Sequence, residues 1–385
     1  MIGALLLAAC QDSTSLPTVP TTPMPAVQDV QVSESGASVA WNLIARDLVK
    51  KYTMGAAPAI RVYALVSTAQ HQAVTTAGEN GGNPVRASES AAAAGASAAV
   101  LTYLFPSEAP FLEGKVDEQE QTPFPGSEGK SFSAGEQIGR TIAVNVIEDA
   151  KGDRFFTPFT GTVPTCPGCW LAVPTPPAFA TLGQARTFFL TTGNQFRPPP
   201  PPAFGSPAFV ADLAEVRRIS DTRTPVQDSI AKFWSLQGGT VTPLGYWNEV
   251  AAGLIAKYSL NERRAARTLA VMNMAGYDAI VASHEAKYVY WLIRPTQADP
   301  NITLPIALPS FPAYPSNHAA ISAAAATVLG DVFPAERSKL LSQAEQAAIS
   351  RIYGGIHYRF DATAGVTLGK KIGRLALDIG PKGTK

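Results

Sequence analysis

Three short segments in the second half of the chain bring together cations and two of its four histidines. They are Lys287–Pro295, Tyr314–Ala319 and Ser350–Asp361. The first holds a lysine and an arginine, the second a histidine, and the third two arginines, a histidine and an aspartate. Arginine presents a fork of donors that suits tetrahedral oxygens, and lysine presents a point charge. If the segments meet in the fold, they predict a binding site for an oxyanion.

The predicted anion cage consists of Lys287, Arg294, Arg351 and Ser316. Its three cations stand on otherwise apolar or small-residue segments. The serine follows a proline and precedes a predicted helix, so it can cap that helix while free backbone N–H groups at the helix start face an anion.

The two histidines in these segments have different predicted roles. A Gly-Gly pair interrupts the helical pattern before His357, which places His357 near the start of the next helix. Asp361 is four residues further on, so it shares a helix face with His357 and can accept from one of its ring nitrogens. The other nitrogen is then available as a nucleophile or a ligand. His318 is a separate imidazole that can move protons.

The remaining histidines and two aromatic residues of the first segment are not expected to take part in the chemistry. We expect His71 and His284 to be structural, with His284 beside the site. We expect Tyr290 and Trp291 to pack in the core rather than to bind a ligand.

The elements that must position these groups are predicted to be helices. Long segments are rich in Ala, Leu, Ile, Lys, Arg and Glu, which favour helices. Leu254, Ile255 and Tyr258 follow the 3.6-residue stripe, and the Ala-rich segment 316–332 ends before Pro334. Alternating strand patterns are scarce. The fold class is therefore all-α, with two helical bundles.

The chain also repeats itself. At a shift of 206 residues Trp41-Asn42 falls on Trp247-Asn248 and Lys51-Tyr52 on Lys257-Tyr258, and at a shift of 228 Phe105-Pro106 falls on Phe333-Pro334. His318 falls on Ser90, and Lys287–Pro295 has no counterpart. We interpret this as an internal duplication: residues 36–150 form a degenerate helical half and residues 236–385 a second half with the active site. Residues 151–235, which include five consecutive prolines, are expected to form an irregular connection.

The three motifs together resemble a known signature. Lys-x6-Arg-Pro, Pro-Ser-x-His and Ser-Arg-x5-His-x3-Asp are similar to the motifs of the type 2 phosphatidic acid phosphatase superfamily, which it shares with vanadium-dependent haloperoxidases. The length, the duplicated helical halves and the stretch 222–234 are more similar to the bacterial haloperoxidase branch. The resemblance implies an all-α fold of two bundles.

The resemblance also implies residue roles. His357 would be the single protein ligand of vanadate or, in a phosphatase, the nucleophile that forms phosphohistidine. His318 would be the acid–base group, Asp361 would orient His357, and Lys287 would also act in catalysis by polarising the bound oxidant.

The oxyanion-binding groups implied by the resemblance are Lys287, Arg294, Ser316, Asn317 and Arg351. Asn317 departs from the family pattern, which usually has glycine there. Asn tolerates the left-handed region better than most residues, so the backbone donor can survive the change. Its side chain would add a donor or crowd the anion.

The leading functional hypothesis is a vanadate-dependent haloperoxidase-type enzyme that oxidises a halide with hydrogen peroxide and serves a small organic substrate. The alternative is an exported phosphomonoesterase, with phosphate in the same site, because vanadate and the phosphoryl transition state are both five-coordinate oxyanions. A third hypothesis is a non-catalytic lipoprotein that binds phosphate or a partner, although pure binding has no need of His318.

Composition excludes other partners. The 385 residues carry 31 basic and 30 acidic side chains, so no field attracts nucleic acid. No apolar run is long enough to span a bilayer, so we expect membrane association only through a lipid anchor.

The cysteines and the chain start suggest export. Residues 1–9 resemble a lipoprotein signal peptide, although no Lys or Arg precedes the apolar run; Cys10 would be lipidated, and residues 10–35 would form a Ser/Thr/Pro-rich tether. The alternative is an apolar N-terminus with a chance cysteine. We expect the protein in the periplasm or cell envelope. Cys166 and Cys169 are then expected to form a structural disulfide, since thiol chemistry favours a helix start and zinc needs two more ligands nearby.

Overall fold

The computed structural model describes residues 36–79, 86–172 and 176–381, and these residues are predominantly helical. Two isolated bridges are the only β-pairing among them. The expected signal peptide (1–9), lipidation site (Cys10) and tether (10–35) lie outside the described residues. None of the described helices is both long and apolar enough to cross a membrane.

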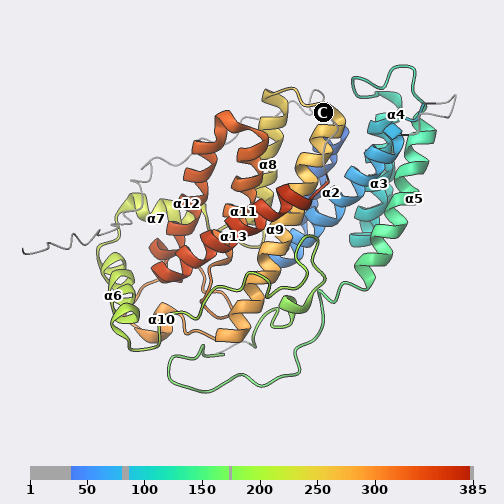
Figure 1. Ribbon diagram of the computed structural model, residues 1–385. Coiled ribbons are helices and arrows are strands. Elements are labelled where there is room, and N and C mark those ends of the chain that lie inside the picture. Colours follow the sequence, from blue (N-terminus) through green and yellow to red (C-terminus); the bar gives the residue numbers. More distant parts are fainter. Residues whose placement is uncertain (1–35, 80–85, 173–175, 382–385) are drawn as a thin grey trace, which may run out of the picture.

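The helices fall into two series joined by a long connection (Figure 1). The first series is α1 (Ala37–Lys51), α2 (Ala56–Glu79), α3 (Glu89–Leu104), α4 (Ala109–Gln121) and α5 (Phe132–Lys151). The second series is α8 (Thr242–Lys257), α9 (Glu262–Tyr290), α10 (Pro295–Ala298), α11 (Asn317–Val332), α12 (Arg337–Tyr353) and α13 (Arg359–Ile379). Short 3-10 turns occur at η2 (Pro106–Glu108), η3 (Leu182–Gln184) and η4 (Pro334–Glu336).

The order of elements repeats as the sequence shifts predict. Helices α1 to α5 are matched by α8, α9, α11, α12 and α13, and a 3-10 turn precedes both α4 and α12. Ser88 caps α3 by accepting from the N–H of Ala91, and Ser316 caps α11 by accepting from the N–H of Ala319. The extra helix α10 falls between α9 and α11, in the part that has no counterpart in the first half.

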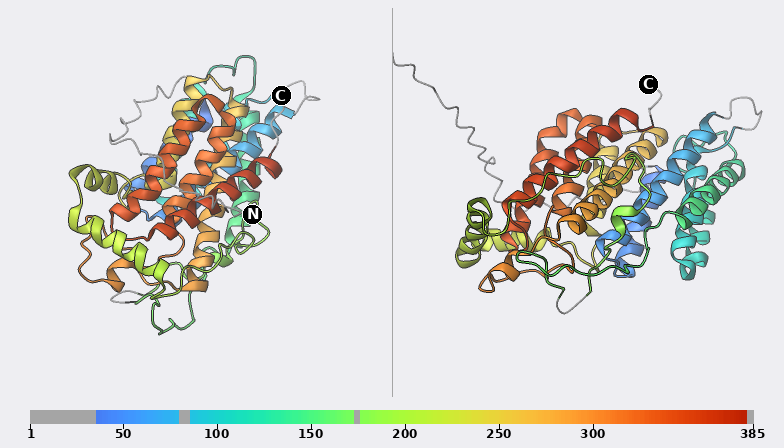
Figure 2. Two further views of the ribbon diagram at one scale, coloured as in Figure 1. Left: turned by 60° about the vertical axis from the view of Figure 1, so that its left-hand side comes forward. Right: turned by 60° about the horizontal axis from the view of Figure 1, so that its bottom comes forward.

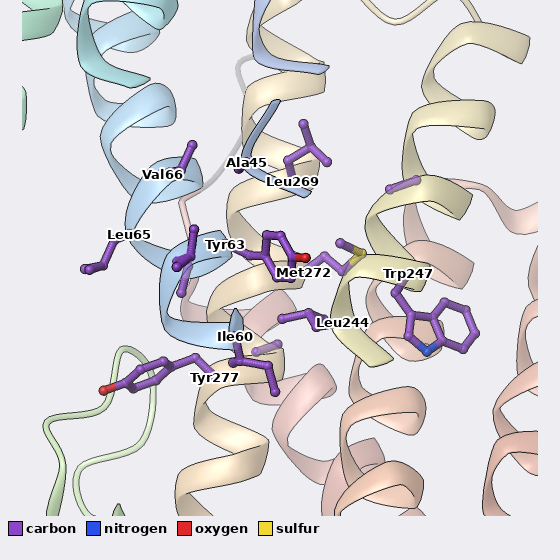
Figure 3. Packing of buried hydrophobic residues seen from close by; sticks show 14 of the residues in the cluster. Ala45, Ile60, Tyr63, Leu65, Val66, Leu244, Trp247, Leu269, Met272 and Tyr277 are labelled. Carbon is purple, nitrogen blue, oxygen red and sulfur yellow. The ribbon is translucent and has the colours of Figure 1, made fainter. Parts of the chain in front are cut away.

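The two halves share one hydrophobic core. Helices α2 and α9 lie side by side at the centre, and Figure 3 shows Tyr63, Leu244 and Met272 packed between them and α8. At the same boundary Asn273 Nδ2 donates to Ser67 Oγ (2.8 Å) and to Asn248 Oδ1 (2.8 Å). Since both halves contribute to this cluster, we describe them as one folded body.

Close helix contact places the start of α13 beside the start of α11. A Cβ added at Gly369 of α13 would overlap the carbonyl oxygen of Ala320 in α11, so only glycine permits this approach. At the ends of the two helices, the N–H of Ser316 donates to the carbonyl of Asp361 (3.0 Å). The second and third sequence motifs therefore meet.

The expected irregular connection is partly helical. Residues 207–233, which we placed within it, form α6 (Pro207–Thr222) and α7 (Pro225–Phe233), whose N-caps are Ser206 and Thr224. Each cap is followed by proline at the first helical position, where a missing N–H removes no hydrogen bond. The described residues between α5 and α6 hold only η3 and otherwise run irregularly along the bundle (Figure 2).

Candidate active site

His357 is buried between α12 and α13, and its two ring nitrogens have different partners. Nδ1 lies 2.8 Å from Asp361 Oδ2, and Nε2 lies 3.1 Å from Nη1 of Arg294. A guanidinium can only donate, so Nε2 accepts this hydrogen bond and Nδ1 carries the proton that Asp361 accepts. The Nε2 lone pair is therefore directed toward the anion cage, where it can bind a ligand or attack an electrophile.

Asp361 is fully buried in the first turn of α13. Its Oδ2 accepts both from His357 Nδ1 and from the N–H of Tyr358 (3.0 Å). Burial raises the pKa of Asp361 to about 7. The pairing predicted from the i, i+4 spacing is thus present, and it holds the imidazole in one orientation.

Arg294 lies at the N-cap of α10 and is fully buried. Its Nε donates to the carbonyl of Phe311 (3.0 Å) and Nη1 to the carbonyl of Ile356 (2.7 Å). Within the described residues its Nη2 has no hydrogen-bond partner. A buried donor without an acceptor is unfavourable, so this atom is suited to an anion oxygen.

Arg351 lies in the last turn of α12, and its exposed fraction is 1%. Its Nε donates to Ser350 Oγ (2.9 Å), and Nη2 donates to the carbonyl of Ala231 (2.9 Å). No ion pair found among the described residues involves this arginine. Its hydrogen-bond partners are neutral oxygens, so its positive charge is available to a bound anion.

Lys287 is fully buried on α9, and its ammonium already has three partners. Nζ donates to the carbonyls of Pro312 (2.9 Å), Ala313 (2.8 Å) and Pro315 (2.6 Å). A lysine has three N–H donors, so all of them are used. Lys287 therefore offers the cage its positive charge, and direct contact with an anion would require one carbonyl to give way.

Ser316 and Asn317 begin α11, as predicted. The hydroxyl of Ser316 accepts from the N–H of Ala319 (3.4 Å). Asn317 is not among the described residues with positive φ, so glycine is not required at this position. Its Oδ1 accepts from Ser283 Oγ (2.9 Å), which holds the side chain against α9.

His318 occupies the first turn of α11 and is half-buried. Burial and the positive charges of Arg351 and Lys287 lower the pKa of His318 well below its usual range, while backbone groups of Ser235 and Trp234 oppose this shift. Its Nε2 has no partner among the described residues. The imidazole is therefore neutral near pH 7, with one nitrogen available.

The electrostatics of the site follow from burial. Desolvation, with the neighbouring cations Arg294, Lys287 and Arg351, lowers the pKa of His357 well below its usual range. Burial also lowers the pKa of Arg294 to about 10 and that of Arg351 to about 9. The arginine shifts report burial, and the His357 shift also reports neighbouring positive charge, an arrangement that an oxyanion would stabilise.

Two residues at the site have roles that the sequence pattern did not indicate. The ring of Phe311 lies 5.2 Å from both Lys287 Nζ and Arg294 Cζ, so its face contacts two cage cations. The carbonyl of Ala231 holds Arg351 from α7. An aromatic contact and a backbone acceptor from a distant segment leave no spacing signal in the sequence.

The other two histidines lie where a structural role places them. His284 is buried on α9, and its Nδ1 lies 3.0 Å from the carbonyl of Ile280. Its ring packs 5.3 Å from that of Phe311, so it is beside the site. His71 is on α2 in the first half, close to Arg267, and away from the anion cage.

A disulfide joins Cys166 and Cys169 in the connection. Next to it, the N–H of Trp170 donates to the carbonyl of Trp291 (2.6 Å), and the N–H of Ile293 donates to the carbonyl of Gly168 (2.9 Å). The disulfide-bonded loop thus holds the segment between Lys287 and Arg294 in place through two backbone hydrogen bonds. Within the described residues no group of three or more His, Cys, Asp or Glu side chains could hold a metal cation.

Tyr290 and Trp291 are half-buried and pack against the connection, which differs from the expected core position. The hydroxyl of Tyr290 donates to the carbonyl of Pro198 (2.7 Å), and the ring of Trp291 lies 6.3 Å from that of Trp170. Both residues anchor the loop after α9.

Sequence comparison supports the predicted superfamily. The family model of the PAP2 superfamily matches residues 266–384, which carry all three motifs. The match covers the region that carries the cage residues and agrees with the resemblance found in the motifs.

Curated relatives include decaprenylphosphoryl-5-phosphoribose phosphatase of Mycobacterium tuberculosis, strain CDC 1551 / Oshkosh. It is 33% identical over 108 residues, or 28% of this chain. The protein of the same name from strain H37Rv matches equally. The chain spans 60% of the length of these relatives.

Comparison with solved structures confirms the all-α fold over most of the chain. The crystal structure described as the first bacterial vanadium-dependent iodoperoxidase has a TM-score of 0.74 at 24% identity, covering 89% of this chain and 94% of that one. A holo-type bacterial vanadium-dependent chloroperoxidase has a TM-score of 0.68 at 14% identity, covering 85% and 92%. The architecture is thus that of the bacterial vanadium haloperoxidase structures.

Proposed function

We propose that the protein is a vanadate-dependent haloperoxidase-type enzyme in which His357 holds the vanadate. The observation that carries this proposal is the protonation pattern of His357, whose Nε2 accepts from Arg294 while Nδ1 is bound to Asp361. The unpartnered Nη2 of Arg294 gives an anion oxygen a donor. These residues fit a tetrahedral or five-coordinate oxyanion. The likeness in fold to haloperoxidase structures across most of the chain supports the same reading.

The chain's own residues would then divide the work. Lys287, Arg294 and Arg351 neutralise the oxygens, and burial keeps water from screening their charges. Bound vanadate would supply a Lewis acid that activates hydrogen peroxide for reaction with a halide, without a change of its own oxidation state. His318 would move the proton at its available Nε2.

The second candidate is a phosphatase, and the sequence comparisons favour it specifically. The curated relatives are phosphatases, and the residues matched by the superfamily model contain all three motifs. In this chemistry His357 Nε2 would attack the phosphorus of a phosphate ester, and His318 would protonate the leaving oxygen. The same anion cage would hold the equatorial oxygens in both reactions.

One experiment separates these candidates. The purified protein is assayed for bromination of a phenol with hydrogen peroxide after addition of orthovanadate, and in parallel for hydrolysis of p-nitrophenyl phosphate without vanadate. We expect vanadate-dependent bromination, which His357→Ala abolishes and His71→Ala leaves unchanged. Ester hydrolysis without any bromination would establish the phosphatase. Neither activity in the wild type would favour a binding protein.

Export as a lipoprotein through Cys10 remains a prediction of the sequence, because that residue lies outside the described residues.

A further inference from the structure

Helix α7 is the last helix of the connection, and its C-terminal end packs into the second half. The residue that follows it, Trp234, is fully buried. Its Nε1 donates to Oε1 of Gln346 on α12 (3.0 Å), and its ring meets that of Tyr246 on α8 edge-on at 4.8 Å. At the other end, Nε of Arg223 donates to the carbonyl of Tyr353 (2.8 Å).

The same helix reaches the anion cage. The carbonyl of Ala231 accepts from Nη2 of Arg351, and the partner of Nε in that arginine is its own neighbour Ser350. Backbone groups of Trp234 and Ser235 also interact with His318. Helix α7 and the two residues after it therefore interact with one cage cation, on α12, and with the predicted acid–base group, on α11.

The first half provides a comparison within the same molecule. Residues 40, 41 and 118 fall on 246, 247 and 346 at the shifts of 206 and 228, and those three positions in the second half contact Trp234. In the first half, the place that corresponds to the Trp234 site is a cavity of about 490 Å³ between α1 and α4. No counterpart of α7 covers it among the described residues.

The first half also lacks the chemistry. At the shift of 228, Ser90 stands for His318 and Pro123 stands for Arg351. Among the described residues, the cavity between α1 and α4 in the first half is uncovered, whereas α7 fills the corresponding place in the second half.

We propose that α7, docked through Trp234, Gln346 and Arg223, positions Arg351 and His318 for anion binding, which makes Trp234 and Gln346 positioning residues. This inference deepens the proposed function, because it names the residues that hold the anion site in place. It rests on the proposed function only for the reaction that the bound anion takes part in. Binding of the anion itself can be measured whichever reaction the site performs.

The test uses a matched pair of variants. Trp41 Nε1 donates to Oε1 of Gln119 at 2.9 Å, a buried indole–glutamine bond like that of Trp234 but far from the cage. Trp234→Phe and Trp41→Phe each remove one such bond and keep an aromatic ring. Titration calorimetry with orthovanadate and with inorganic phosphate is carried out on the wild type and both variants.

We expect Trp234→Phe to weaken binding of both anions about tenfold, the order expected when a charged donor loses its aligned hydrogen bond. Trp41→Phe should bind as the wild type does, although both variants should lose similar thermal stability. Gln346→Met should match Trp234→Phe, and the double variant should be no weaker than either, because all three lose the same bond. Equal binding in Trp234→Phe and Trp41→Phe would overturn the proposal.

A second variant covers the case in which Trp234→Phe does not fold. Arg223→Ala changes a half-exposed side chain and removes the hold of α7 on Tyr353 and on the carbonyl of Thr303 (2.8 Å). We expect several-fold weaker anion binding with retained helicity, and unchanged binding counts against the proposal. If the wild type binds vanadate but shows neither bromination nor hydrolysis, the proposed function fails while this inference stands.

Discussion

At the scale of single residues, the decisive contact is the one between Arg294 and His357. An arginine donor at Nε2 and a carboxylate at Nδ1 together fix one tautomer of the imidazole. The ligand nitrogen therefore faces cations rather than water. The tautomer and orientation of His357 are thus fixed before any anion binds.

Asp278 on α9 is a buried carboxylate that serves the scaffold. Its two oxygens accept from the N–H groups of Phe188 (2.8 Å), Phe189 (2.7 Å) and Leu190 (2.9 Å) in the connection. Burial raises the pKa of Asp278 to about 6, while these hydrogen bonds oppose the shift. The charged form is thus disfavoured in the fold.

This shift predicts a pH dependence of stability. Because the pKa of Asp278 in the folded state exceeds its unfolded value of about 3.9, its contribution is present below that value and is lost as pH rises through about 6. The wild type should therefore lose about 1.4 kcal/mol relative to Asp278→Asn between about pH 5 and about pH 7.5. Urea unfolding at both pH values measures it. A constant difference between the two proteins contradicts the prediction.

Sequence reasoning reached the site well at this scale but not completely. Lys287, Arg294, Arg351 and His357 were predicted as neighbours because residue type and order suffice to suggest an oxyanion site. The three carbonyls that hold Lys287 could not be predicted, since backbone acceptors carry no residue identity. They depend on how the loop before α11 turns.

At the scale of elements, the loop between α9 and α10 is held by hydrogen bonds from the connection. Gly168 and Trp170 bond to Trp291 and Ile293, next to the Cys166–Cys169 disulfide. A positive φ of 78° at Gly168 suits a residue without a side chain. The disulfide-bonded loop is therefore a brace for the segment that carries two cage cations.

Removal of this brace should destabilise the protein modestly. For a loop this short, the chain-entropy model gives about 2 kcal/mol for the double change Cys166→Ser and Cys169→Ser. Thermal unfolding of the variant should match that of the wild type in reductant. If reductant leaves the transition of the wild type unchanged while the variant unfolds at a lower temperature, the serine substitutions are responsible, and the brace is not the cause.

The helices of the connection show what element prediction missed. Ser206-Pro207 and Thr224-Pro225 are both N-terminal helix signals, and each begins a helix. The proline-rich neighbourhood led us to treat residues 151–235 as a single irregular stretch. The long helices α9 and α11 were easier, because their apolar and small residues extend over many turns.

At the scale of the whole molecule, the duplicated halves are not independent. Helix α2 is buried along most of its length against α3, α5, α8 and α9. Asn42, Ser67, Asn248 and Asn273 form one buried hydrogen-bonded group across the boundary. The duplication was visible in the sequence, but the extent of this shared interior was not, because it depends on how two copies face each other.

The shared core predicts that the second half cannot fold alone. A fragment of residues 236–381 contains almost all of the region matched by the superfamily model but exposes the faces of α8 and α9 that cover α2. We expect it to aggregate or to lack a cooperative thermal transition, measured by circular dichroism, and coexpression with residues 36–235 should restore the transition. A monomeric fragment that unfolds cooperatively by itself would show that we have overestimated the interface.

The three carbonyl acceptors of Lys287 have a consequence for how bound anions are exchanged. Its ammonium is satisfied before any ligand arrives, so the site does not need to collapse or refold when it is emptied. Dialysis should be enough to swap one tetrahedral oxoanion for another. A single preparation can thus be tested in turn with every chemistry that the pocket admits.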